Sequence, residues 1–164
     1  SYGINNKAKR IVFASSMSVY GDHNKKLKEE FSLDPKSCYG ISKLTSENYL
    51  KLFSKKIPFV SLRMFNVYGP GQNLSDLKQG MVSIYLAQAQ KNKTILVKGS
   101  LNRVRDFIYI DDVVELWKKA IYKKNILNKS FNLGTGMPTS VRKITNLILK
   151  NFNNCKIKSP LCKN

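Results

Sequence analysis

Two spacings of apolar residues alternate along this chain of 164 residues. Short apolar runs, which are typical of buried strands, predict strands over residues 10–15, 59–63, 94–98, 107–110 and 130–133. Apolar residues three and four positions apart predict helices over about 39–53, 81–90, 112–122 and 141–152. Because strands and helices alternate, we expect an α/β fold with a mainly parallel sheet.

Polar residues and glycines mark where these elements begin and end. Asp111 or Asp112 is interpreted as the N-cap of the third helix rather than as a catalytic group, and Ser140 as the N-cap of the last helix. The glycines and proline of residues 66–71 predict a turn. No internal repeat and no low-complexity linker divides the chain.

A net charge of +19 raises the possibility of a nucleic-acid-binding module. Lysines outnumber arginines by 24 to 5, however, whereas surfaces that read bases favour the forked guanidinium of arginine. Most lysines stand in scattered pairs, which are typical of solvated helix faces. We therefore expect no nucleic-acid partner, and a salt-dependent gel shift would reverse that expectation.

The rest of the composition excludes several other classes of protein. No apolar run approaches the ~18 residues of a membrane-spanning helix. A single histidine, His23, and scattered cysteines at 38, 155 and 162 do not have zinc-site spacing, so no metal site is predicted. Three unpaired cysteines fit reduced thiols, and thus a cytoplasmic protein, better than a disulfide scaffold.

The clearest candidate chemistry is the pair Tyr39 and Lys43 on the first predicted helix. Four residues apart, the phenol and the ammonium share one helix face, so the cation can favour the phenolate, a proton acceptor. About one such pair is expected by chance from eight tyrosines and 24 lysines (8 × 24/164 ≈ 1.2). The pair alone therefore fits equally well an aromatic core residue beside a solvated lysine.

Four further blocks follow one another in a definite order around this pair. Ser15–Gly21 follows the first strand, and the other blocks are Leu62–Pro70, Arg105–Val113 and Asn132–Gly136. In this order and spacing the five blocks resemble the NAD-dependent epimerase/dehydratase family of sugar-nucleotide enzymes, part of the extended short-chain dehydrogenases/reductases. The resemblance runs from about residue 10 to 150.

The resemblance implies a catalytic trio of Ser16, Tyr39 and Lys43, with NAD as cofactor. Tyr39 would take the proton of a sugar hydroxyl while hydride passes to the nicotinamide. Lys43 would support the Tyr39 phenolate and bind the nicotinamide ribose, and Ser16 would hydrogen-bond the reacting oxygen. An epimerase of the UDP-hexose 4-epimerase type, working through a 4-keto sugar, is the leading expectation.

Three further residues match binding positions of the family. Phe65 matches the residue that flanks the nicotinamide, Asn66 an amide that contacts the sugar nucleotide, and Arg105 the guanidinium that grips the substrate diphosphate. Without the resemblance, the alternative for Asn66 is a turn residue that satisfies its own backbone. Arg105 could be a strand-edge cation on the same face as Arg103.

The sequence departs from the family pattern at two points. Met17 and Ser18 stand where several sugar-nucleotide dehydratases have Asp-Glu, which disfavours that reaction and leaves epimerase, decarboxylase or reductase. None of the nine glycines has the spacing of the family's pyrophosphate-binding loop, and family members are roughly twice as long.

We therefore expect one partial domain that lacks its Gly-rich N-terminal half. It would comprise the C-terminal half of a Rossmann-like parallel-sheet domain plus much of the smaller substrate-binding region. Residues 10–63 would carry Rossmann-like strands and the catalytic helix, residues 64–150 mixed substrate-binding and Rossmann segments, and residues 151–164 a basic tail.

Such a fragment would be inactive by itself, and a catalytically inactive remnant that serves only in binding is the alternative from another class. At full length, the resemblance implies a homodimer through the helix that holds Tyr39 and Lys43.

Overall fold

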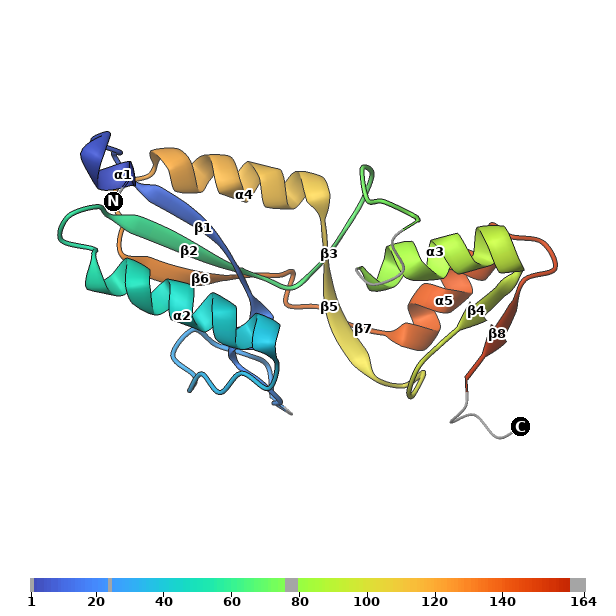
Figure 1. Cartoon of the computed structure of the whole chain (residues 1–164). Coiled ribbons are helices and arrows are strands. Elements are labelled where there is room, and N and C mark those ends of the chain that lie inside the picture. Colours follow the sequence, from blue (N-terminus) through green and yellow to red (C-terminus); the bar gives the residue numbers. More distant parts are fainter. Residues whose placement is uncertain (1, 24, 76–79, 160–164) are drawn as a thin grey trace. The chain divides into compact units, whose positions relative to one another are not determined.

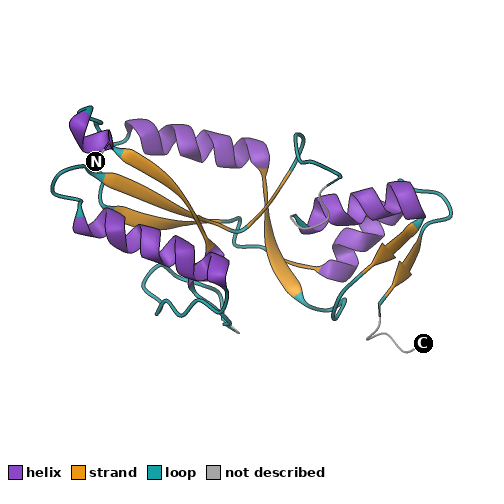
Figure 2. Cartoon of the chain, in the orientation of Figure 1, coloured by secondary structure: helices purple, strands orange, loops and turns teal. Residues whose placement is uncertain are grey.

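The computed structural model describes residues 2–23, 25–75 and 80–159, and its elements group into two units (Figure 1). The first unit comprises Ser1–Phe65 and Asp111–Gly134, and the second comprises Asn66–Ile110 and Thr135–Asn164. In each unit helices lie against strands (Figure 2), as expected for an α/β protein.

The first unit is built on a parallel sheet with the strand order β1-β2-β6. Its strands are β1 (Ile11–Ser16), β2 (Phe59–Met64) and β6 (Lys129–Leu133). Helix α2 (Cys38–Leu52) covers one face of the sheet and α4 (Ile110–Tyr122) the other (Figure 1). Two short helices complete this unit, α1 (Tyr2–Asn5) and the 3-10 turn η1 (Met17–Val19).

The central strand β2 explains why this sheet is stable. Phe59, Val60 and Leu62 are all buried, and burying such side chains contributes about 1.5–3 kcal/mol each. Ser61 and Arg63 are buried as well, although they are polar. The register places Arg63 between Ser15 of β1 and Asn132 of β6, so polar residues form a row across the sheet.

The second unit contains a three-stranded mixed sheet and a two-stranded one. In the first, β5 (Val104–Tyr109) pairs with β3 (Asn66–Tyr68) in parallel and with β7 (Pro138–Ser140) in antiparallel. In the second, β4 (Thr94–Leu96) pairs with β8 (Lys156–Lys158). Helices α3 (Met81–Asn92) and α5 (Val141–Leu149) cover a core formed by Tyr85, Ala89, Ile95, Val97, Leu101, Val141 and Ile148.

The structure confirms the predicted α/β class and the existence of every predicted strand and helix. The capping prediction is confirmed at Ser140, whose Oγ accepts a hydrogen bond from the Lys143 amide at 3.2 Å. It is wrong at the third helix, which begins at Ile110, so Asp111 and Asp112 lie inside its first turn. There their carboxylates still interact favourably with the positive end of the helix dipole.

Four elements were not predicted: α1, η1, β7 and β8. In addition, the first three residues of the predicted turn over 66–71 form β3. All five elements have at most four residues, too few to display a periodic pattern. Of the helices in the described residues, none is long and apolar enough to cross a membrane.

Candidate active site

The carboxyl end of β1 carries the first of the predicted catalytic residues. Ser16 is the last residue of β1 and the N-cap of η1. Its Oγ accepts a hydrogen bond from the Ser18 amide at 3.2 Å and lies 3.1 Å from the Ser18 hydroxyl. Ser16 is buried, and its contacts with Ser18 hold the hydroxyl in place.

Helix α2 brings Tyr39 and Lys43 to the same end of the sheet. Ser37 caps the helix by accepting a hydrogen bond from the Gly40 amide at 3.0 Å, which places Tyr39 in the first turn. The Lys43 ammonium donates to the carbonyl of Ala14 in β1 at 2.8 Å and lies 5.4 Å from the centre of the Tyr39 ring. Lysine and tyrosine are therefore adjacent, as the sequence spacing predicts, while Tyr39 stays 55% exposed.

Gly40 lets α2 approach η1 closely. A Cβ atom at Gly40 would lie 2.5 Å from the Ser18 carbonyl oxygen and 2.9 Å from Cβ of Pro35. Only a residue without a side chain fits this contact without displacing the backbone. The contact connects the segment that follows Ser16 to the helix turn that carries Tyr39.

Of the other predicted binding residues, Phe65 belongs to the first unit and Asn66 and Arg105 to the second. Phe65 is half-buried, and its amide donates to the carbonyl of Leu133 at 3.1 Å. The Asn66 side-chain amide donates to the carbonyl of Asp106 at 2.9 Å rather than to its own backbone. In β5, Arg105 lies opposite Thr139 and donates to the carbonyl of Val104 at 2.8 Å.

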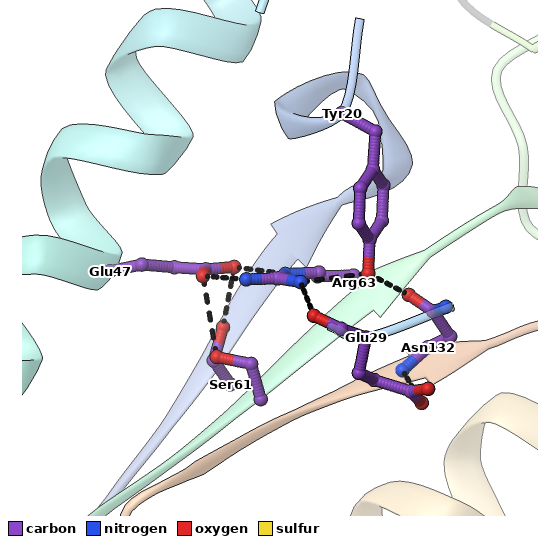
Figure 3. Close-up of polar contacts among 7 residues, drawn as sticks. Tyr20, Glu29, Glu47, Ser61, Arg63 and Asn132 are labelled. Atoms are coloured by element: carbon purple, nitrogen blue, oxygen red, sulfur yellow. Dashed lines mark hydrogen bonds and ion pairs between the residues drawn. The ribbon is translucent and has the colours of Figure 1, made fainter. Parts of the chain in front are cut away.

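A buried ion pair that the sequence did not predict lies between α2 and β2 (Figure 3). Glu47 of α2 and Arg63 of β2 are 0% and 2% exposed. The Arg63 guanidinium donates to the Glu47 carboxylate through Nε at 3.0 Å and through Nη2 at 2.7 Å. The same carboxylate accepts hydrogen bonds from the hydroxyls of Ser61 at 3.0 Å and Ser130 at 3.3 Å.

The third nitrogen of Arg63 reaches the segment after β1. Its Nη1 donates to the hydroxyl of Tyr20 at 2.7 Å and to the carbonyl of Glu29 at 3.4 Å. The Tyr20 hydroxyl in turn donates to Oδ1 of Asn132 at 2.7 Å, as Figure 3 shows. The Glu29 carboxylate accepts a hydrogen bond from the backbone amide of Asn132 at 2.8 Å.

Burial and charge act against each other in this cluster. Burial alone would raise the pKa of Glu47, but hydrogen bonds from Arg63 and Ser61 and the charge of Arg63 outweigh it, so the pKa lies below its usual range. Burial raises the pKa of the Tyr20 phenol, although the hydrogen bond and charge of Arg63 oppose this. The ion pair is therefore charged and Tyr20 is a neutral hydroxyl at neutral pH.

The carboxylate of Asp106, which was not among the predicted site residues, binds residues of the block Gly134-Thr135-Gly136. The Asp106 carboxylate accepts hydrogen bonds from the Thr135 amide at 2.9 Å, the Thr135 hydroxyl at 2.6 Å and the Gly136 amide at 2.7 Å. Asp106 stands directly after Arg105, so its block was already marked by the sequence. Within residues 2–23, 25–75 and 80–159, no three His, Cys, Asp or Glu side chains are placed to hold a metal ion.

Comparison with known proteins gives matches over most of the chain. Residues 2–134 match the model of the NAD dependent epimerase/dehydratase family. A putative UDP-glucose 4-epimerase of Methanocaldococcus jannaschii is 37% identical over 143 residues, which are 85% of this chain and 46% of that protein. A dTDP-4-dehydro-6-deoxyglucose reductase of Escherichia coli is 34% identical over 87% of this chain and 46% of its own length.

The fold is also similar to solved structures of such enzymes. A UDP-glucose 4-epimerase of Thermotoga maritima, solved with UDP-glucose, has a TM-score of 0.86 and 31% identity, covering 96% of this chain and 53% of that one. The chain thus spans about half the length of the curated relatives it matches. Because the family model matches 133 of 164 residues (134 − 2 + 1) and the fold agrees, the chain belongs to the NAD-dependent epimerase/dehydratase family.

Proposed function

We propose that this chain supplies the catalytic and substrate-binding half of an NAD-dependent nucleotide-sugar epimerase of the UDP-hexose 4-epimerase type. The observation that carries the proposal is the position of Lys43, bonded to Ala14 of β1 and adjacent to the Tyr39 ring. The similarity to UDP-glucose 4-epimerases supports it.

The residues present fit the nicotinamide end of the cofactor. An ammonium has three N–H donors, and Lys43 uses one of them on Ala14, so two remain for hydroxyls of the nicotinamide ribose. Tyr39, Lys43 and Phe65 would hold this end. The glycine spacing that would bind the pyrophosphate is absent from this chain, so these residues would provide only part of the cofactor site.

In the proposed reaction, protein groups move one proton while NAD supplies the redox chemistry. NAD, when held by Tyr39, Lys43 and Phe65, would supply the hydride-transfer chemistry at the sugar carbon. The Tyr39 phenolate oxygen accepts the proton of the sugar hydroxyl as the C–O bond becomes a carbonyl, and Lys43 stabilises the phenolate. The Ser16 hydroxyl hydrogen-bonds the same oxygen. After the 4-keto sugar turns over, Tyr39 returns the proton.

Arg105 and Asn66, both in the second unit, match positions of the family that bind the nucleotide sugar. Arg105 presents a planar fork of donors, which suits the diphosphate of a nucleotide sugar. Asn66 would contact the sugar nucleotide through its side-chain amide.

A UDP-sugar decarboxylase or reductase with the same trio is the alternative. The similarity to the reductase of E. coli supports a reductase as this alternative. Met17 and Ser18 lack the carboxyl groups with which a dehydratase of the Asp-Glu type moves protons during loss of water.

Three further aspects belong to the same proposal. Exposed apolar residues on α2, with Ile41 at 53% and Leu52 at 71%, support a homodimer through this helix in the full-length protein. Free cysteines such as Cys38 and Cys155 fit a cytoplasmic location. The scattered lysines favour no nucleic-acid partner.

The test is an epimerase assay on the chain together with whatever its gene encodes on either side. The protein is incubated with UDP-glucose and NAD, and UDP-galactose is measured. Tyr39→Phe should lower kcat by roughly 10²–10⁴-fold because it removes the proton acceptor. Tyr122→Phe, at a 78% exposed position on α4, is the matched control and should leave kcat unchanged. Normal turnover by the Tyr39 variant would contradict the proposal.

A further inference from the structure

We propose that Arg63 is a positioning residue: its single guanidinium connects the helix that carries Tyr39 and Lys43 to the segment that follows Ser16, and so sets the geometry of the proposed catalytic trio (Figure 3). The inference rests on the proposed function for the roles of the trio. The connection itself rests only on contacts within the first unit.

The first branch of the connection fixes α2. Glu47 lies one turn after Lys43 and two turns after Tyr39, so the three residues share one side of the helix. Two parallel hydrogen bonds from Nε and Nη2 of Arg63 define both the position and the orientation of the Glu47 carboxylate. Fixing Glu47 against β2 therefore fixes the rotation of α2 about its axis, and with it the direction in which the first turn presents Tyr39.

The second branch fixes the segment after β1. Tyr20 is four residues beyond Ser16, is 0% exposed, and accepts a hydrogen bond from Nη1 of Arg63 while donating to Asn132. The Arg63 side chain also lies over the Tyr20 ring, with Cζ 4.9 Å from the ring centre. Nη1 further reaches the carbonyl of Glu29 in the loop that leads to α2. Arg63 thus contacts the chain between Ser16 and Tyr39 at two places, Tyr20 near its start and Glu29 near its middle.

The chemistry of the cluster argues for positioning beyond simple stability. Two charges buried together often stabilise a fold no better than apolar residues of similar volume would, because desolvation offsets their attraction. A planar guanidinium does what an apolar side chain cannot do, because its donors point in fixed, divergent directions. It therefore sets the angle between the two segments as well as their distance.

Three substitutions separate the two branches. Tyr20→Phe removes the hydroxyl of the loop branch, Glu47→Gln removes the charge of the helix branch, and Arg63→Lys retains the charge but loses the fork. Each has a matched control at an exposed residue, namely Tyr122→Phe, Glu115→Gln in the exposed pair with Lys119, and Arg142→Lys.

The first readout is amide hydrogen exchange, which needs no substrate or cofactor. Tyr20→Phe should raise exchange about tenfold in residues 17–22 and leave residues 38–43 unchanged. Beyond the general rise that its loss of stability causes throughout the first unit, Glu47→Gln should raise exchange in residues 38–43 and not in residues 17–22, and Arg63→Lys should raise exchange in both segments. The three controls should change neither segment.

A purely structural role predicts a different pattern. All three variants would then raise exchange evenly over the first unit, in proportion to the stability they lose, and this result would overturn the proposal. Unchanged exchange in Arg63→Lys would overturn it too. If Arg63→Lys does not fold, the Tyr20→Phe variant alone decides. A rise in exchange confined to residues 17–22 supports the proposal, whereas a rise spread evenly over the first unit, or no rise, contradicts it.

The second readout is turnover of the full gene product. Misplacing catalytic groups should lower kcat of Arg63→Lys by roughly 10–100-fold while KM for the nucleotide sugar changes much less. A rise in KM with unchanged kcat would contradict positioning of the trio. If the wild-type protein has no turnover, the proposed function fails, whereas the exchange pattern still reports on the connection through Arg63.

Discussion

Glu47 and Arg63 are charged residues enclosed between a helix and a sheet, and each satisfies the other. The hydroxyls of Ser61 and Ser130 also donate hydrogen bonds to the carboxylate. A charge without its partner at such a place is strongly destabilising, by about 3–5 kcal/mol. This ion pair leads to one testable prediction, and Gly40 leads to another.

The first prediction concerns acid stability. Because the pKa of Glu47 is lowered in the folded state, its contribution to the free energy of unfolding is present above its unfolded pKa of about 4.3 and is lost as pH falls through its lower folded pKa. We expect Glu47→Gln to be less stable than wild type at neutral pH by about 3 kcal/mol, and the difference to shrink in acid. Urea unfolding at a series of pH values measures this.

The exposed pair of Glu115 and Lys119 provides the control for this experiment. Glu115→Gln should cost less than about 1 kcal/mol at any pH, since solvent screens that pair. A Glu47→Gln variant that loses no more stability than this control would refute the prediction.

The second prediction concerns Gly40. Alanine favours a helix over glycine by about 1 kcal/mol, but its Cβ would overlap the Ser18 carbonyl. We expect Gly40→Ala to lower the free energy of unfolding by about 1–3 kcal/mol, because the backbone contact leaves no room for relaxation. Ser42→Ala, at an exposed position of the same helix, should be neutral or stabilising. Stabilisation by Gly40→Ala would mean that α2 can shift freely.

At the scale of elements, caps and strand edges decide how each segment ends. Ser140 caps α5 as its position in the sequence predicts, because the signal lies within four residues. Asp111 and Asp112 do not cap α4, which begins one residue earlier, where β5 ends. The continuous passage from strand to helix cannot be inferred from the local composition.

The cap of α5 leads to the third prediction. Ser140→Ala should destabilise the second unit by about 1 kcal/mol, because the Lys143 amide loses its acceptor. Ser140→Asp should retain the stability of the wild type, since its carboxylate can accept the hydrogen bond from the Lys143 amide. Thermal unfolding followed by circular dichroism is the measurement, and equal melting temperatures for alanine and serine would contradict it.

The fourth prediction concerns β1. It pairs with β2 alone in the described part of the chain, so no strand pairs with its other edge, where the Ala14 carbonyl is bonded to Lys43, and its residues Ile11, Val12 and Phe13 are only half-buried. Such an edge is a template for pairing with another chain. We expect the 164-residue chain to form species larger than a dimer as its concentration rises, as measured by light scattering. A strictly monomeric or dimeric chain would show that the edge is protected.

At the scale of the whole molecule, the chain spans about half the length of its relatives. It contains the Ser16, Tyr39 and Lys43 trio but no glycine spacing that would hold a pyrophosphate. In Rossmann folds a glycine-rich turn and the helix N-terminus that follows it bind the dinucleotide pyrophosphate. We therefore expect this distribution of binding groups to limit the cofactor affinity of the chain more than the proposed catalytic trio does.

The fifth prediction follows from this distribution. Isothermal titration should detect little or no NAD binding to the 164-residue chain, and correspondingly little turnover. The full gene product, if its gene encodes a glycine-rich strand-turn-helix upstream, serves as the positive control. Tight binding to the 164-residue chain would show that the residues present suffice to hold the cofactor.

The α/β class, the order of the main elements, the family, and the adjacency of Tyr39 and Lys43 could all be predicted from the sequence. All of these depend on local spacing, which a helix or strand converts directly into geometry. The five blocks identified the family because their order is preserved along the chain, whatever the tertiary contacts.

Which polar residues are buried depends on tertiary contacts and could not be predicted from the sequence. Ser61 and Arg63 alternate with apolar residues as solvent-facing positions of a strand do, yet both are buried, because α2 covers that face and supplies Glu47. Glu47 in turn looks like an ordinary charged helix residue. Arg63 lies 16 residues from Glu47 and 43 from Tyr20, and no local spacing connects positions so far apart. Their connection exists only because folding closes those loops around one guanidinium.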